Sequence, residues 1–238
     1  MKADNRLIVA LDFNTMDQVR DMVNQLGDTV RYYKVGMELF YSVGREAVDF
    51  LRQQKKEVFL DLKLHDIPNT VSRSAAVLTN LGVSMMNIHA AGGPSMMKAT
   101  ALAVAQAAEN ASLPRPKLIA VTILTSMDEA EWRELGYNTS VVGQALHLAR
   151  MVKKAGLDGV VASPQEAEAI RKECGPEFLI VTPGVRPLGS AVNDQSRIAT
   201  PAGAIKSGSS HLVVGRPITG ASNPQASAEA IVREMGGR

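Results

Sequence analysis

Residues 58–70 read VFLDLKLHDIPNT, and the first half of this stretch has the pattern of a buried β-strand. Val58 and the leucines that follow at every second position fall on one face, whereas Asp61 and Lys63 fall on the other. Placing ionised groups inside a sheet or barrel costs free energy unless the charges are paired. The stretch therefore predicts a strand that carries charged groups either to a functional site or into a structural ion-pair network.

Similar short apolar runs recur along the chain, and segments of helical period lie between them. The other runs begin at Leu7, Tyr32, Met85, Lys117, Gly159, Phe178 and His211. The predicted helices include residues 15–26 and 140–155, one capped by Ser163 that stops at Gly175, and a last one capped by Asn223. About eight strands, each followed by a helix, predict a (β/α)8 TIM barrel.

A doubly wound open sheet is the alternative fold, but such sheets often have a glycine-rich first turn. Here the first turn, residues 10–17, reads ALDFNTMD and contains no glycine. No Pro/Ser-rich linker divides the chain, so we expect one domain over residues 1–238. Residues 184–208 form a long loop after the seventh strand, with a possible short helix around 199–206. A loop of this length is either a lid or a surface excursion.

Composition excludes several function classes. The formal net charge of the 238 residues is only +2, without the basic runs that nucleic acids or membrane surfaces attract. No apolar run approaches the length of a membrane span, and the N-terminus has no signal-peptide layout. Cys174 is the only cysteine, so an internal disulfide is impossible and a reducing compartment is expected. These features predict a soluble cytoplasmic protein.

Polar residues gather at the predicted carboxyl ends of the strands, where TIM barrels place their active sites. They are Asp12, Lys34, Asp61, Lys63, Asp66, Asn87, His89, Thr125, Ser126, Arg186, Gly215 and Arg216. Neighbouring carboxylates favour the charged form of Lys63, which suits a proton donor better than an amine nucleophile. Ammonium groups among the acids would compete with a cation, so we expect no metal.

The end of the eighth strand is suited to phosphate. Gly215 allows a ligand to approach the main chain, and Arg216 supplies a planar cationic fork. The loop after the seventh strand adds Arg186, Gln195 and Arg197 as donors. Barrels often bind phosphate in this place, although a Gly-Arg pair alone is also compatible with an ordinary exposed arginine.

The pattern Asp61-x-Lys63-x-x-Asp66-Ile67-Pro68-x-Thr70 resembles the signature of the orotidine 5′-phosphate decarboxylase family. Further motifs of the same family run along nearly the whole chain. They are LDF at 11–13, YKVG at 33–36, HAAGG at 89–93, LTS at 124–126, TPGVR at 182–186, DQ-x-R at 194–197 and VVGRPI at 213–218. The D-x-K-x-x-D core also occurs in related sugar-phosphate decarboxylases and aldolases on the same barrel, so a magnesium-dependent enzyme of that kind is the alternative. A barrel that only binds a nucleotide phosphate is a further one.

The resemblance implies a homodimeric enzyme without cofactor or metal that converts orotidine 5′-monophosphate to uridine 5′-monophosphate in pyrimidine synthesis. It implies that Lys63 protonates C6 and that Asp61 lies beside the substrate carboxylate. Lys34 would complete an alternating array of charges formed by Lys34, Asp61, Lys63 and Asp66. Asp12 and Lys34 would hold ribose hydroxyls, and Thr125 and Ser126 would lie at the pyrimidine edge. Asp66, Ile67 and Thr70 would reach the neighbouring subunit's site. The implied phosphate ligands are Arg186, Gln195, Gly215 and Arg216.

Overall fold

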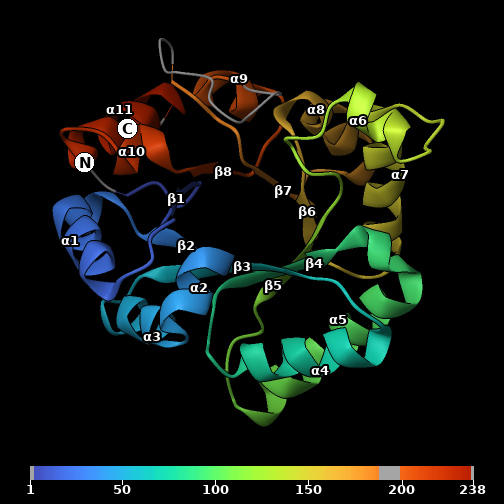
Figure 1. Cartoon of the computed structure of the whole chain (residues 1–238), viewed down its shortest axis with the longest axis horizontal. Helices are drawn as coiled ribbons and strands as arrows, with labels where there is room; N and C mark the ends of the chain where they lie inside the picture. The colour runs from blue at the N-terminus through green and yellow to red at the C-terminus, as the bar shows by residue number, and fades with distance from the viewer. Residues whose placement is uncertain (1–2, 188–198, 237–238) are drawn as a thin grey trace.

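Eight parallel strands close into a barrel in the order β1 to β8, with helices packed around the outside (Figure 1). The structure is a computed structural model that describes residues 3–187 and 199–236. The predicted TIM barrel is confirmed, and the open doubly wound sheet is excluded because β1 pairs with β8. Within the described residues, no helix combines the length and apolar character needed to cross a bilayer.

The strands are β1 (Leu7–Ala10), β2 (Tyr32–Gly36), β3 (Glu57–Leu64), β4 (Met85–His89), β5 (Lys117–Val121), β6 (Gly159–Val161), β7 (Leu179–Thr182) and β8 (His211–Val214). The helices are α1 (Met16–Leu26), α2 (Met37–Val43), α3 (Glu46–Gln53), α4 (Pro68–Thr79), α5 (Gly93–Asn110), α6 (Glu129–Glu134), α7 (Val141–Lys154), α8 (Pro164–Cys174), α9 (Pro201–Lys206), α10 (Arg216–Thr219) and α11 (Pro224–Glu234). Short 3-10 turns cover Gly27–Thr29 and Ala90–Gly92.

The predicted helix starts are confirmed by side-chain caps. The hydroxyls of Thr15, Ser140 and Ser163 each accept a hydrogen bond from a main-chain N–H in the first turn of the helix that follows. Asn223 does the same for α11 through its side-chain oxygen. These caps satisfy N–H groups that have no partner within the helix, so the sequence marks these boundaries locally.

The strands are buried on both faces, which explains their continuous apolar runs. One apolar cluster lies between the barrel and its helices and includes Val58, Leu60 and Leu62 of β3. A second cluster fills the barrel itself: Ile8, Ala10, Tyr32, Phe59, Met85, Ile119, Val181 and Val213. The outward direction predicted for the β3 leucines is therefore confirmed.

The expected unbroken alternation of β3 is wrong at Lys63. Leu60 pairs with Met86 and Leu64 with Ile88, so the same interval contains two more residues on β3 than on β4. Lys63 adopts a φ of 51°, a left-handed conformation that is uncommon for residues other than glycine. An irregularity of this kind re-aims a side chain at the rim of a barrel.

The predicted short helix near residue 199 is confirmed as α9. At the start of the long loop, Val185 forms an isolated bridge with Ala199, and the N–H of Arg186 donates to the carbonyl of Ala199 at 3.0 Å. The ends of the intervening segment therefore lie side by side. Residues 188–198, on which the predicted lid depends, lie outside the described residues.

Candidate active site

A polar layer lies directly above the apolar filling of the barrel, toward the carboxyl ends of the strands. Lys34 is two residues beyond the interior Tyr32, and Asp61 is two residues beyond the interior Phe59. Since strand side chains alternate with a period of two, these steps keep the same inward face. The barrel core thus changes from apolar to charged within one layer.

The charged groups of this layer form an alternating row. Lys34 Nζ lies 2.8 Å from Asp12 Oδ1 and 3.5 Å from Asp61 Oδ2. Lys63 Nζ lies 2.8 Å from Asp61 Oδ1. The sequence-predicted residues Asp12, Lys34, Asp61 and Lys63 are therefore brought together, with each carboxylate next to an ammonium.

Opposite charges keep the buried pair of Lys34 and Asp61 ionised. Burial alone would raise the pKa of Asp61, but the charges of Lys34 and Lys63 outweigh it and hold that pKa below its usual value. Burial alone would lower the pKa of Lys34, but Asp61 and Asp12 raise it above its usual value. Both groups are therefore charged at neutral pH, so a ligand meets a row of fixed charges.

Lys63 is the most accessible ammonium of the row. Its side chain is 26% exposed, whereas the side chains of Lys34 and Asp61 are each 11% exposed. A ligand at the barrel mouth can therefore reach Lys63 without displacing the buried pair. Such access is one requirement for a group that exchanges a proton with a bound ligand.

Asn87 belongs to this layer, although sequence reasoning gave it no role. Its side chain is only 1% exposed, and Nδ2 donates to Asp61 Oδ1 at 2.7 Å. Its Oδ1 accepts a hydrogen bond of 2.8 Å from the main-chain N–H of Lys63. The available signal was its place two residues after the interior Met85, in a run that is otherwise apolar up to His89.

Asp66, Ile67 and Thr70 lie around the start of α4, beside Lys63 and not within the charge row. All three are exposed, and Asp66 Oδ1 accepts a hydrogen bond of 2.7 Å from the N–H of Ile67. A groove of about 380 Å³ is lined by Lys63, Asp66 and Thr70 together with Met37 and Tyr41. Asp66 therefore shares a groove with Lys63, but it does not continue the row through the ion pairs that join its other members.

Two guanidinium groups lie near each other beyond β7 and β8. Arg186 is buried, and burial together with the charge of Arg216 lowers its pKa. Its Nη1 donates to the carbonyl of Val185 at 3.0 Å, while its Nε has no hydrogen-bond partner among the described residues. A buried cation held near a second cation is stabilised by an anion.

Gly215 connects this cationic region to the charge row. A Cβ atom added to Gly215 would lie 3.6 Å from Asp12 Oδ2 and 3.6 Å from the side chain of Ala10. The main chain at Gly215 therefore borders the same mouth as Asp12. Gln195, also predicted here, lies outside the described residues.

Thr125 and Ser126 follow β5 in the loop before α6. Thr125 is 9% exposed and Ser126 is exposed, so the two hydroxyl groups differ in access to solvent. Their position after the carboxyl end of a strand is the one predicted.

Among the described residues, no group of three or more His, Cys, Asp or Glu side chains is arranged to hold a metal ion.

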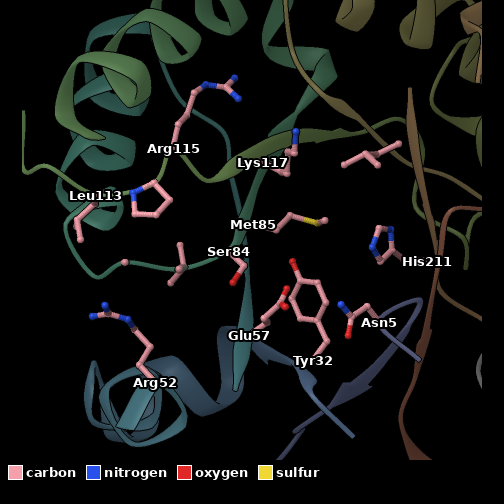
Figure 2. Close-up of a pocket in the computed structure, with 14 residues that line it drawn as sticks. Asn5, Tyr32, Arg52, Glu57, Ser84, Met85, Leu113, Arg115, Lys117 and His211 are labelled. Carbon is pink, nitrogen blue, oxygen red and sulfur yellow. The ribbon is translucent and has the colours of Figure 1, made fainter. Parts of the chain in front are cut away.

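A cavity of about 500 Å³ lies at the opposite end of the barrel, where the strands begin. Figure 2 shows Tyr32, Met85 and His211 directed toward this space from the starts of three strands. Arg115 on its rim is paired with Asp158 at 2.8 Å. In TIM barrels this end contributes to stability, and the charge row lies at the other end.

Comparisons with known proteins identify the family of the chain. The family model described as Orotidine 5'-phosphate decarboxylase / HUMPS family matches residues 5–231. An orotidine 5'-phosphate decarboxylase from Moorella thermoacetica is 49% identical over 236 residues, which cover 99% of this chain and 94% of the relative. The enzyme of that name from Caulobacter sp. strain K31 is 47% identical, with full coverage of both chains.

A solved structure also matches. The crystal structure of orotidine 5'-phosphate decarboxylase from Lactobacillus acidophilus superposes with a TM-score of 0.86 at 43% identity and covers 98% of this chain and 99% of that one. Both the sequence and the fold of this chain thus match these decarboxylases over almost its whole length. The chain belongs to the orotidine 5'-phosphate decarboxylase / HUMPS family.

Proposed function

We propose that this enzyme converts orotidine 5′-monophosphate to uridine 5′-monophosphate and carbon dioxide by electrostatic catalysis, with Lys63 as the proton donor. The observation that carries the proposal is the row Asp12–Lys34–Asp61–Lys63 at the carboxyl ends of the strands. Within it, Lys63 has the ammonium that a substrate can reach. The whole barrel acts as one catalytic domain in the last step of pyrimidine synthesis.

Fixed charge suits this reaction because loss of carbon dioxide from C6 leaves a poorly delocalised carbanion. The ammonium of Lys63 stabilises the developing negative charge and then transfers a proton to C6. An ammonium about 4 Å from a full negative charge contributes roughly 4 kcal/mol at an effective dielectric constant near 20. That energy corresponds to about a thousandfold in rate, so further contributions are needed.

Asp61 supplies one such contribution. A carboxylate that stays ionised beside the substrate carboxylate repels it, and the repulsion is relieved as carbon dioxide leaves. The lowered pKa of Asp61 keeps this charge in place at neutral pH. Lys34 holds Asp61 from the other side and, together with Asp12, is placed to bind the ribose hydroxyls.

The substrate phosphate binds between Arg186 and Arg216, next to the main chain of Gly215. The unpartnered Nε of Arg186 and the proximity of Arg216 supply the donors and the excess positive charge that a phosphate satisfies. Gln195 adds a donor from the loop. Thr125 and Ser126 complete the site at the pyrimidine edge, after β5.

The enzyme acts as a homodimer in which Asp66, Ile67 and Thr70 reach the neighbouring site. Ile67 is 65% exposed and Tyr41 is 73% exposed in the single chain, which leaves apolar surface beside the groove at Lys63. Asp66 of the partner subunit would extend the row beyond Lys63. Cys174 is buried and unpaired, which suits a reducing compartment, so we expect the enzyme in the cytoplasm.

No cofactor or metal takes part in the proposed reaction. Lys34 and Lys63 each lie within ion-pair distance of Asp61, so a divalent cation there would have to displace an ammonium. The alternative is a magnesium-dependent sugar-phosphate decarboxylase or aldolase, since the family model spans more than one activity by its description.

The test follows the loss of orotidine 5′-monophosphate absorbance with purified protein and excess chelator. Turnover that survives exhaustive chelation supports the proposal. Turnover that disappears with the chelator and returns with magnesium favours the alternative enzyme. Tight binding of uridine 5′-monophosphate without any turnover would instead leave a protein that only binds the nucleotide.

A further inference from the structure

Asn87 joins the two residues on which the proposed chemistry depends. It lies in the middle of β4, and both polar atoms of its side chain are used. Its Nδ2 donates to Asp61 Oδ1 at 2.7 Å, and its Oδ1 accepts from the N–H of Lys63 at 2.8 Å. One buried amide therefore fixes a carboxylate and the main chain of the neighbouring lysine together.

Only one orientation of this amide satisfies its partners. If Asn87 were rotated by half a turn, its oxygen would face the carboxylate of Asp61 and its NH2 group would face the N–H of Lys63. Acceptor would then meet acceptor, and donor would meet donor. Since Asn87 is 1% exposed, water cannot readily compensate for these clashes. The amide is thus locked in the orientation that binds both residues.

The main chain at Lys63 needs such a partner because β3 leaves its regular pairing there. The register with β4 shifts between Leu60 and Leu64, and the φ of Lys63 is 51°. A residue held in this conformation persists only where the surrounding structure stabilises it. The hydrogen bond from Lys63 N–H to Asn87 replaces the bond that a regular ladder would have supplied.

The bond to Asp61 has a separate consequence. Asp61 Oδ1 already receives Lys63 Nζ at 2.8 Å, and the bond from Asn87 fixes the carboxylate plane around that contact. Asp61 Oδ2 then remains directed toward Lys34, 3.5 Å away. Without the amide, the carboxylate could rotate and the row would lose its geometry.

We propose that Asn87 is a positioning residue that sets the Lys63 main chain and the Asp61 carboxylate in their productive arrangement. The inference rests on the proposed roles of Asp61 and Lys63. Asn87 acts through these two residues and needs no contact with substrate. Its removal therefore lowers kcat, whereas the proposed phosphate contacts at Arg186 and Arg216, to which Asn87 has no hydrogen bond, stay in place.

Two substitutions test this role. Asn87→Leu keeps the approximate size but removes both hydrogen bonds, and we expect kcat to fall by about 10- to 100-fold, as when a residue that orients a metal ligand is replaced. Binding of uridine 5′-monophosphate should stay within about threefold of wild type, since each tenfold in affinity requires 1.4 kcal/mol. Thr182→Val on β7 is the matched control, because Thr182 is fully buried and its hydroxyl bonds to Ser209 instead.

Asn87→Asp gives a readout that a purely structural role would not produce. The protonated form of the introduced carboxyl can donate to Asp61 as the amide does, whereas the ionised form repels Asp61. The neighbouring Asp61 carboxylate favours the protonated form of the introduced carboxyl. The protonated fraction increases further as pH falls. We therefore expect the kcat of this variant, relative to wild type, to rise as pH is lowered, while Thr182→Val keeps the wild-type profile.

The outcomes separate this inference from the proposed function. If Lys63→Ala is inactive but both Asn87 variants keep kcat within about threefold of wild type, the positioning role is overturned and the proposed function stands. If Lys63→Ala itself remains active, the role proposed for Lys63 as the proton donor fails. If Asn87→Leu does not fold, Asn87→Asp provides the test. A kcat relative to wild type that does not change with pH overturns the positioning role, and a relative kcat that rises as pH is lowered supports it.

Discussion

Lys63 and Asp61 form an ion pair of 2.8 Å even though the main chain between them leaves the regular pleat of β3. The irregularity lifts Lys63 toward the mouth of the barrel, while Asp61 stays in the buried layer beside Lys34. The pair thus has one buried and one accessible member. That difference supports the separate roles proposed for them, with Asp61 as a fixed charge and Lys63 as the group that meets the substrate.

Gly36 offers a way to disturb the charge row without removing a charge. A Cβ added to Gly36 would lie 2.7 Å from Lys34 Nζ, and its φ of −90° is accessible to alanine. We expect Gly36→Ala to shift the ammonium away from Asp12 and lower kcat/KM by about tenfold, or 1.4 kcal/mol. Steady-state kinetics and thermal melts measure the effect.

The control for this variant is Gly143→Ala on α7, outside the charge row, whose new Cβ would meet only Ser140 Oγ at 3.0 Å. It should keep kcat/KM within about twofold, because alanine is favourable in a helix. Equal losses of activity in the two variants would mean that space at Lys34 has no special importance.

Arg216 should matter for substrate capture and for activation. Arg216→Ala removes one of two neighbouring guanidiniums, and a charge-assisted pair of this kind contributes about 1.5–3 kcal/mol, so KM should rise by about 10- to 100-fold.

In the wild-type enzyme, free phosphite should restore part of the rate with a substrate that lacks its phosphate. If phosphite restores no activity, binding at the phosphate site does not activate decarboxylation.

The proposal that two subunits share each active site predicts a mixing result. In a twofold-symmetric dimer, a mixed dimer of Lys63→Ala and Asp66→Asn subunits contains one site with both native residues. Random mixing should therefore restore about one quarter of wild-type activity from two inactive proteins. Lys63→Ala mixed with Asp61→Asn is the matched control, since both residues belong to the same site. If neither mixture recovers activity, Asp66 acts only in the site of its own subunit.

His211 should make stability depend on pH. Burial lowers the pKa of His211 to about 4, whereas an unfolded chain titrates near 6.5. Between these two pKa values the unfolded state binds more protons than the folded state. The contribution of His211 to the free energy of unfolding is therefore complete above about pH 6.5 and is lost as pH drops toward 4. Between about pH 7.5 and pH 5 the loss is about 2 kcal/mol.

Urea unfolding at the two pH values measures this loss. His211→Phe keeps a ring against Tyr32 and should lose the part of the pH dependence that His211 contributes, whereas His89, whose pKa burial also lowers, keeps its own part. The exposed His147 provides the comparison, because His147→Gln should keep the wild-type dependence. An unchanged dependence in His211→Phe would show that another group titrates in this range.

The barrel could be predicted because its signals are local. Continuous apolar runs gave the strands, and the caps Ser163 and Asn223 marked the helix starts. The polar residues of the mouth were also predictable, since Lys34 and Asp61 follow interior residues at a spacing of two.

The sequence could not predict contacts that depend on register between strands. The left-handed conformation of Lys63 and its bond to Asn87 follow from the shift between β3 and β4, which apolar periodicity does not encode. The buried, incompletely paired Arg186 depends in the same way on how the chain turns after β7. Asp66 illustrates another limit, because its proposed role lies across a subunit boundary.

The most direct test of the central claim measures single-turnover decarboxylation by Lys63→Ala with saturating orotidine 5′-monophosphate, alongside its affinity for uridine 5′-monophosphate. If the ammonium of Lys63 stabilises and protonates C6, turnover should fall by about a thousandfold or more, while the variant still binds the product. If the variant retains more than about a tenth of wild-type turnover, less than about 1.4 kcal/mol has been lost, and that result would contradict the role of Lys63 as the proton donor.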